Sequence, residues 1–333
     1  MGLFSFFTGS PAAGPSGDHV DIVENNTLIS EENIPKMADS SDSKGLPTME
    51  SLHNITHEIF PVPFEGVKLV INQGFNQHFQ LNHSFAFGSE KQSGYKFGAT
   101  YVGNTKLSET EIYPIMLGEL SPNGNLNAQI IHQFDQKIKC KYVSQMKIGK
   151  IDGQQFSIEH KNKDINLGFS IVNPSIQNKE ISCIFDVMRK MTDRLSLGSM
   201  FVFQRSNQAQ FTNFGVWNVG GQYVGNKWTA AIGIRPFQSS LHSTFHMKLN
   251  DTFQIGTEIE TSLGHRQCVG TAGYQYDFPK TGITIKSQID SNWKIATSYE
   301  RKFLSPIPFS INLCINGDIW KSIYGLGVGF SIL

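Results

Sequence analysis

Histidine and cysteine are the residue types that most often carry chemistry, and here neither is spaced as in a catalytic or metal site. The ten histidines contain no H-E-x-x-H motif. The cysteines are Cys140, Cys183, Cys268 and Cys314. They lie 43, 85 and 46 residues apart, so there is no C-x2-C pair of the kind that binds zinc. The sequence therefore predicts no enzyme activity, no metal and no cofactor, and we expect free thiols in a reducing compartment.

Charged residues could still bind a partner, but they are scarce and balanced. The chain has 333 residues, of which 17% are charged, with 28 Lys and Arg against 28 Asp and Glu. Soluble domains usually contain about 25% charged residues. A net charge of zero argues against a nucleic-acid-binding protein. No run approaches the roughly 18–20 apolar residues of a membrane-spanning helix. What the charges do therefore depends on the elements that position them.

From Val67 to the end of the chain, apolar and polar residues alternate with a period of two, which is typical of two-faced β-strands. Turn sequences such as Asp152-Gly153 and Gly225-Asn226 separate these runs. We count about nineteen strands of roughly ten residues each, with short connections. No helical pattern of useful length interrupts them. The sequence thus predicts an all-β domain over residues 65–333.

Alternation does not decide whether the apolar face points into a core or out to lipid. Strands of about ten residues fit a tilted crossing of a bilayer, whereas globular strands average five or six. A closed ring of about nineteen strands would enclose a lumen too wide for apolar side chains to fill, so the polar faces must line it. Aromatic residues near strand ends, as at Tyr95 and Tyr324, suit the two membrane interfaces. These features favour a transmembrane β-barrel over a soluble all-β binding module.

The N-terminal 64 residues differ from the rest. Residues 1–47 contain seven acidic and two basic residues, with four prolines and little apolar periodicity, so we expect an acidic disordered tail. Residues 48–64 predict a short amphipathic helix and a linker, with Thr48 as the N-cap and prolines ending the helix. Its apolar stripe consists of Met49, Leu52, Ile55 and Ile59. On periodicity alone, the simplest interpretation is a helix that caps a domain.

Several runs resemble one known family. They include Asn72-Gln73-Gly74, His78-Phe79-Gln80-Leu81-Asn82-His83, Phe97-Gly98-Ala99-Thr100-Tyr101-Val102-Gly103, Leu126-Asn127-Ala128-Gln129-Ile130-Ile131-His132-Gln133, Gly273-Tyr274-Gln275-Tyr276-Asp277-Phe278-Pro279 and Asp290-Ser291-Asn292-Trp293. In this order along the chain, they resemble the channel-forming subunits of the translocase of the outer mitochondrial membrane. The resemblance covers about residues 48–333 and is weakest over 150–250. It implies a nineteen-stranded barrel whose first and last strands are parallel, with the N-terminal helix inside the pore.

The resemblance also implies a function and partners. It implies a protein-conducting channel that passes unfolded precursors with basic amphipathic presequences from the cytosol. The implied partners are a receptor subunit, small single-helix subunits, membrane lipid and further copies of the barrel as a dimer or trimer, but no nucleic acid. The last strand resembles the family's sorting signal at Gly327, Phe330 and Ile332, although Gly325 stands where the signal has a polar residue.

Strand parity places charged residues on the inner face, where an acidic lumen would bind basic presequences. The candidate acidic contacts are Glu180, Asp186, Glu258, Glu260, Asp277, Asp290 and Glu300. The candidate basic sector is Lys137, Lys139 and Lys141. Residues 258–260 form the clearest acidic cluster. The alternative for each carboxylate is an ion pair with a neighbouring lysine.

A metabolite porin of the voltage-dependent anion channel type remains the alternative function. The net charge of +5 over residues 48–333 fits such a porin. The porin's N-terminal helix, however, starts almost at its first residue, whereas about 47 residues precede the helix predicted here. Both interpretations predict the same barrel and the same mitochondrial outer membrane.

Overall fold

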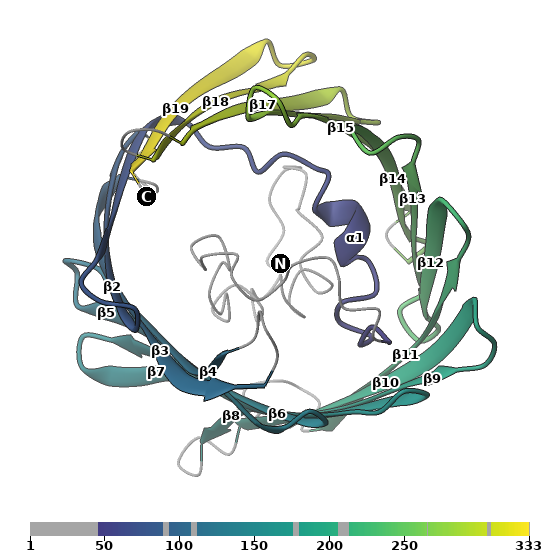
Figure 1. Cartoon of the computed structure of the whole chain (residues 1–333). Helices are drawn as coiled ribbons and strands as arrows, with labels where there is room; N and C mark the ends of the chain where they lie inside the picture. The colour runs from purple at the N-terminus through teal and green to yellow at the C-terminus, as the bar shows by residue number, and fades with distance from the viewer. Residues whose placement is uncertain are drawn as a thin grey trace, which may run out of the picture.

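The computed structural model describes residues 46–88, 93–107, 112–175, 180–205, 213–264, 266–304 and 308–332. The predicted tail, 1–47, lies outside this part except for its last two residues. Within the described part the chain forms nineteen strands and one short helix, α1 (Asn54–His57) (Figure 1). The strands are β1 (Gly66–Gly74), β2 (Phe79–Phe87), β3 (Gly94–Lys106), β4 (Ile112–Leu120), β5 (Asn125–Asp135), β6 (Ile138–Lys147), β7 (Lys150–Lys161), β8 (Ile165–Ser175), β9 (Glu180–Lys190), β10 (Leu195–Arg205), β11 (Asn213–Val224), β12 (Trp228–Arg235), β13 (Ser240–Lys248), β14 (Phe253–Ser262), β15 (Gln267–Phe278), β16 (Ile283–Asp290), β17 (Lys294–Phe303), β18 (Phe309–Asp318) and β19 (Ile323–Ile332).

The strands close into one barrel. Each strand pairs antiparallel with its neighbours in sequence, and β1 closes the ring by pairing parallel with β19. The closing register places Gly66 beside Gly327 and Leu69 beside Phe330. The predicted nineteen-stranded barrel and its parallel closure are both confirmed.

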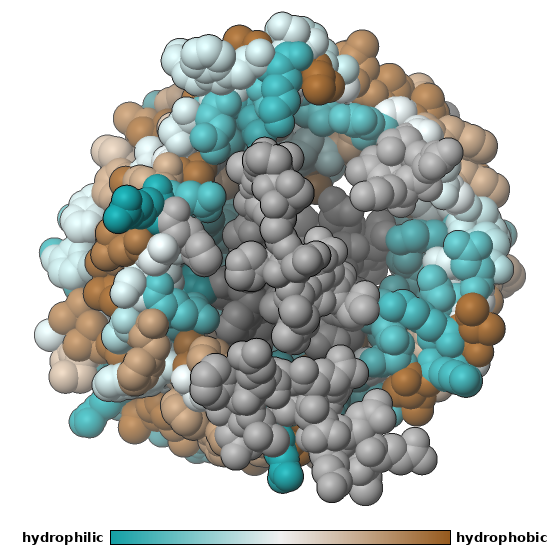
Figure 2. All heavy atoms as spheres, turned by 180° about the vertical axis from the view of Figure 1, so that it is seen from behind, coloured by the Kyte–Doolittle hydropathy of each residue, from teal (hydrophilic) through white to brown (hydrophobic). Residues whose placement is uncertain are grey.

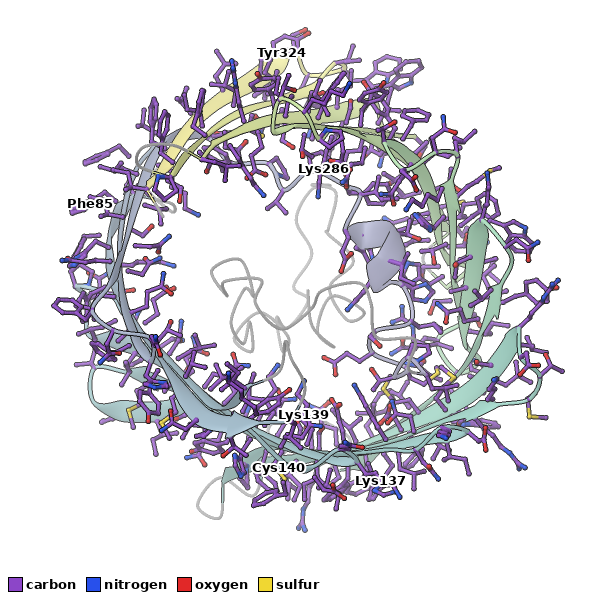
Figure 3. The ribbon with its side chains drawn as sticks, in the orientation of Figure 1. Phe85, Lys137, Lys139, Cys140, Lys286 and Tyr324 are labelled. Atoms are coloured by element: carbon purple, nitrogen blue, oxygen red, sulfur yellow. The ribbon has the colours of Figure 1, made fainter. Side chains whose placement is uncertain are left out.

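The two faces of the wall have opposite character. Large apolar residues on the outward face, such as Phe201, Ile232 and Tyr274, remain 41–44% exposed. Phe85 and Tyr324 point out of the ring, whereas Lys139 and Lys286 lie on its inner side (Figure 3). Figure 2 shows hydrophobic residues around the outside and hydrophilic ones gathered at the mouth. Such a large exposed apolar surface needs lipid, because in water it would associate.

Outward charges occur where a bilayer tolerates them. Arg189, Arg205 and Arg301 share the outward face of their strands, and each lies within two residues of a strand end. Long basic side chains near the ends of a membrane span can reach the polar interface. The Arg301 guanidinium also lies 4.6 Å from the ring centre of Phe303, as in the aromatic belts of membrane proteins.

The helix predicted within residues 48–64 is shorter than expected. Only Asn54–His57 is α-helical, and turns precede and follow it. The N-cap of α1 is His53 and not Thr48 as predicted, because the α-helix starts six residues later than Thr48. Thr48 instead stabilises the preceding turn, where its hydroxyl accepts a hydrogen bond from the Ser51 amide at 3.1 Å and its amide donates to the Ser51 hydroxyl at 2.9 Å. Among the described residues, no helix is long and apolar enough to cross a membrane. Figure 1 shows α1 inside the ring against the wall, as the resemblance implied.

Candidate functional site: the barrel lumen

One part of the inner wall is apolar and holds the N-terminal segment, residues 46–65. Most of the inner face is polar, but the inward positions of β8–β12 form a buried apolar cluster with this segment. The cluster contains Met49, Leu52, Val172, Ile184, Met188, Met200, Val202, Val216 and Ala231, and Leu46 packs against it. Leu52 is only 2% exposed. Burying this apolar surface is what holds the segment inside the lumen.

Three of the four predicted stripe residues are buried. Met49, Leu52 and Ile59 are at most 5% exposed, whereas Ile55 is 42% exposed and does not join the contact. The prediction for Ile55 was wrong because residues 50–53 form turns instead of α-helix, so the helical spacing does not run through the segment. His53 and Thr56 are buried there instead, each 3% exposed.

Polar contacts fasten the N-terminal segment along the wall from β8 to β18. Near its start, Asn166 donates to the Leu46 carbonyl at 3.3 Å, and the Met49 amide donates to Asp186 at 3.3 Å. In the middle, His53 Nδ1 lies 2.8 Å from the Thr244 hydroxyl. The remaining contacts are Lys286 Nζ to the Glu58 carbonyl, and Asn316 Nδ2 to Glu65 Oε1 at 3.0 Å. The segment therefore follows about half of the barrel's circumference.

Glycines in the wall allow this close approach. A Cβ added at Gly220 would lie 3.0 Å from the Met49 methyl carbon and 3.1 Å from Leu52 Cδ2. A Cβ at Gly273 would lie 2.8 Å from the Phe60 ring. Contacts this short are tighter than most real Cβ contacts, so a larger residue at either position would force the packed side chains of the segment to shift.

Two of the predicted acidic contacts are occupied by the N-terminal segment. Asp186 accepts the hydrogen bond from the Met49 amide. Glu258 is 8% exposed beneath α1, with Oε1 2.6 Å from His242 Nε2 and 3.4 Å from His57 Nε2. Both lie on the inner face, as alternation predicted, but neither faces open lumen.

The other acidic residues lie in two groups of the inner wall. Asp277 and Glu300 both oppose Thr284 in the β15–β16 and β16–β17 pairings, so they share one level. Asp277 accepts hydrogen bonds from Gln275 and Thr284, and Glu300 lies 3.6 Å from Lys302. For Glu300, the structure therefore supports the alternative that the carboxylate pairs with a neighbouring lysine.

Toward the opposite end of this part of the sheet, Asp290 of β16 and Glu260 of β14 form the second group. Asp290 accepts hydrogen bonds from the Asn292 and Lys294 amides at 2.8 and 2.9 Å and so caps the turn after β16. The Glu260 side chain is 60% exposed and lies 3.8 Å from His242. Glu260 is thus the more accessible carboxylate of residues 258–260. The Glu180 side chain lies outside the described part of the chain.

The basic sector is smaller than predicted. Lys139 and Lys141 share the inner face of β6, where Lys139 stands opposite Glu159 of β7. Lys137 instead lies in the exposed turn between β5 and β6, on the outer side of the wall in Figure 3. The register of β5 and β6 shifts between Gln133 and Asp135, so alternation could not be extended to this position.

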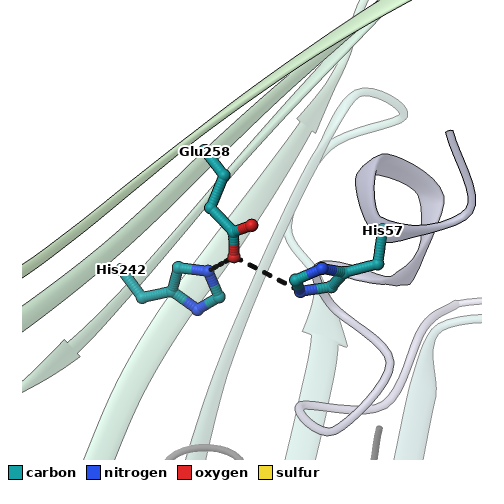
Figure 4. Close-up of side chains that lie close together, drawn as sticks. All are labelled: His57, His242 and Glu258. Atoms are coloured by element: carbon teal, nitrogen blue, oxygen red, sulfur yellow. Dashed lines mark hydrogen bonds and ion pairs between the residues drawn. The ribbon is translucent and has the colours of Figure 1, made fainter. Parts of the chain in front are cut away.

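A histidine cluster joins α1 to the wall, and the sequence did not predict it. His57 of α1, His242 of β13 and Glu258 of β14 converge, and their three ligand-type atoms lie within 4.8 Å of one another (Figure 4). The His53 ring lies 3.8 Å from the His242 ring, centre to centre. Burial lowers the pKa of His53 to about 3 and also lowers that of His57. The alternation of inward and outward residues along β14 already predicted that Glu258 and Glu260 face the lumen. The same alternation along β13 would have placed His242 beside them.

The last strand is covered from inside. Gly327 faces inward beneath Phe64, whose carbonyl oxygen would lie only 2.3 Å from a Cβ at this position. Phe330 and Ile332 share the outward face and stand beside Leu69 and Ile71 of β1. The three residues of the predicted sorting signal thus lie at the closing seam of the barrel.

Comparisons with known proteins agree with this architecture. The family model described as eukaryotic porin matches residues 45–327. Mitochondrial import receptor subunit TOM40 homolog 2 of Drosophila melanogaster is 33% identical over 287 residues, which cover 86% of this chain and 83% of that protein. The TOM40 homolog of Mus musculus is 33% identical over 86% of this chain and 77% of that protein, and the one of Caenorhabditis elegans is 32% identical over 85% and 93%.

A solved structure of a mutant Rh. blastica porin is also similar to this chain. It has a TM-score of 0.44 and 11% identity over 69% of this chain and 94% of that chain. The family assignment depends instead on the family model and the sequence relatives, which extend over most of the chain. They are channel proteins, in agreement with the prediction that this chain is not an enzyme. The chain belongs to the eukaryotic porin family, among the homologues of the mitochondrial import receptor subunit TOM40.

Proposed function

We propose that this chain is a protein-conducting channel of the mitochondrial outer membrane, through which unfolded presequence-bearing precursors pass from the cytosol to the intermembrane space. The observation that carries the proposal is a match to import receptor subunits over most of a closed barrel with a polar inner face. A chain in transit exposes backbone polar groups and charged side chains, which a wet lumen can solvate and an apolar one cannot.

We further propose that basic presequences meet the acidic side chains that the N-terminal segment leaves open. Asp186 and Glu258 are engaged by that segment. Glu260 of β14 lies near one end of the strands, and Asp277 of β15 and Glu300 of β17 lie near the other. Single weak attractions of this kind increase the encounter rate without trapping the precursor, which suits a channel.

In planar bilayers, we expect that neutralising these acidic side chains weakens the block of the channel by a presequence peptide. In the variant Glu260→Gln with Asp277→Asn, the rate of peptide block should fall at least about threefold, and its dependence on salt should become shallower. The matched control is Glu119→Gln with Glu159→Gln, since these carboxylates lie beside Lys96 and Lys161 on another part of the wall. Equal block rates in the wild type and both variants would show that presequences do not bind these acidic side chains.

Depletion separates import from metabolite exchange. Mitochondria depleted of this chain should import matrix precursors more slowly, and re-expression should restore the rate. Normal precursor import together with slower metabolite exchange would instead support an anion porin. Because import in depleted mitochondria is a separate measurement from peptide block, the channel function can stand even if the acidic contacts fail.

We also propose, from the relatives' description as import receptor subunits, that the barrel assembles with a receptor subunit, small single-helix subunits and further barrels in the lipid. Gly327, Phe330 and Ile332 would act as the sorting signal before the barrel closes. The working division of the chain is an acidic tail, 1–47, an inner segment and linker, 48–64, and the barrel, 65–333.

A further inference from the structure

We propose that His57, His242 and Glu258 form a binding site for a divalent transition-metal ion of the zinc type, which ties α1 to the barrel wall. The helix α1 and the neighbouring strands β13 and β14, which follow it by more than 180 residues, supply one ligand each. Two imidazoles and one carboxylate are a ligand set that zinc accepts, with a fourth position left for water.

The distances suit such an ion. Zinc lies about 2.0–2.2 Å from nitrogen and oxygen ligands, so ligand atoms at tetrahedral angles are roughly 3.4 Å apart. His57 Nε2 lies 3.4 Å from Glu258 Oε1. His242 Nε2 lies 2.6 Å from the same oxygen in a hydrogen bond, which an ion would replace after a small side-chain rotation. All three atoms fall within 4.8 Å of one another.

The surroundings hold the ligands in place. His242 and Glu258 are 4% and 8% exposed on a rigid sheet. The His53 ring packs on His242 with an interplanar angle of 36°, while its own Nδ1 is held by Thr244. Packing of this kind fixes the orientation of ligating side chains and raises metal affinity. Figure 4 shows the His57 ring reaching across from α1 toward Glu258.

The fourth position faces the lumen. Glu260 Oε1 lies 3.8 Å from His242 Nε2, and its side chain is 60% exposed. A water molecule, or Glu260 after rotation, would complete the tetrahedron. The proposal concerns the attachment of α1 and is independent of what the lumen conducts.

The test uses the full-length protein, folded in detergent micelles and stripped of metal by a chelator. Zn²⁺ should bind with one equivalent in calorimetry, and Co²⁺ should give the visible absorption of a tetrahedral N/O site that Zn²⁺ then abolishes. His57→Asn and the near-isosteric Glu258→Gln should each lower the Zn²⁺ affinity at least about 100-fold, since each removes a ligand. Far-ultraviolet circular dichroism and single-channel currents establish that each variant forms the barrel.

His246→Asn is the matched control. His246 also faces the lumen from β13, but its Nε2 lies 3.0 Å from Gln254 and outside the cluster. Its substitution should leave the Zn²⁺ affinity unchanged. The site is overturned by a wild-type protein that binds no Zn²⁺, by His57→Asn and Glu258→Gln variants that bind it as the wild type does, or by an equal loss in His246→Asn.

Discussion

Replacing Ile130 with arginine is expected to destabilise the barrel by about 2–4 kcal/mol, the cost of an arginine on the lipid face at the bilayer midplane. Ile130 lies at the middle of β5, and its partners Met116 and Tyr142 lie at the middle of β4 and β6. It is 40% exposed on the outward face. An arginine there is too far from either interface to reach water without distorting the bilayer.

The control is Asn127→Arg on the same strand. Asn127 has the opposite parity and faces the lumen between Glu119 of β4 and Gln145 of β6. Arginine can reach water there and lies beside a carboxylate, so the free energy of unfolding should change by less than about 1 kcal/mol. Guanidinium unfolding of the barrel in lipid vesicles measures both variants. Equal stabilities would mean that the outward face does not contact lipid.

The contrast between Ile130 and Asn127 also shows what the sequence could predict. A period of two assigns each strand residue to a face without any knowledge of distant contacts. The charges of β14, at Glu258 and Glu260, were placed inward on this basis, and the structure agrees. The period-two pattern of apolar and polar residues was therefore enough to predict both the number of strands and the face on which each strand residue lies.

Contacts between distant segments were beyond the reach of alternation. The parallel pairing of β1 and β19 followed only from the family resemblance, because the pattern of each strand is the same whichever neighbour it has. Lys137 was misplaced because the turn and register shift before β6 interrupt the pattern. Whether a carboxylate such as Asp186 is open or engaged depends on the position of Met49, 137 residues earlier.

One informative signal in the sequence was overlooked. The inward positions of β8–β12 include Met188, Met200 and Val216, although the inner face of a wet barrel should be polar. An apolar patch on such a face needs a cover, and the apolar residues of the N-terminal segment are the complement. The inner location of the N-terminal segment could therefore have been predicted from strand alternation without the resemblance.

This complementarity makes Leu52 the residue whose loss should release the segment. Leu52→Asp would place a carboxylate against the apolar cluster, which costs more than the 2–5 kcal/mol of a typical buried Leu→Ala change. The segment can avoid this cost by leaving the wall, since its backbone–backbone hydrogen bonds are local. The barrel itself is held by strand pairing and should stay folded.

Hydrogen exchange detects this release directly. In Leu52→Asp, amides such as those of His57 and Glu58, which bond within the segment, should exchange more than about tenfold faster, because each 1.4 kcal/mol lost is a factor of ten. Amides of β10–β12 should be unaffected. Ile55→Asp, three residues later but 42% exposed, should leave exchange unchanged. Faster exchange in both variants would mean that local helix stability holds the segment, and unchanged exchange in both would mean that the polar contacts along the wall hold it without the apolar cluster.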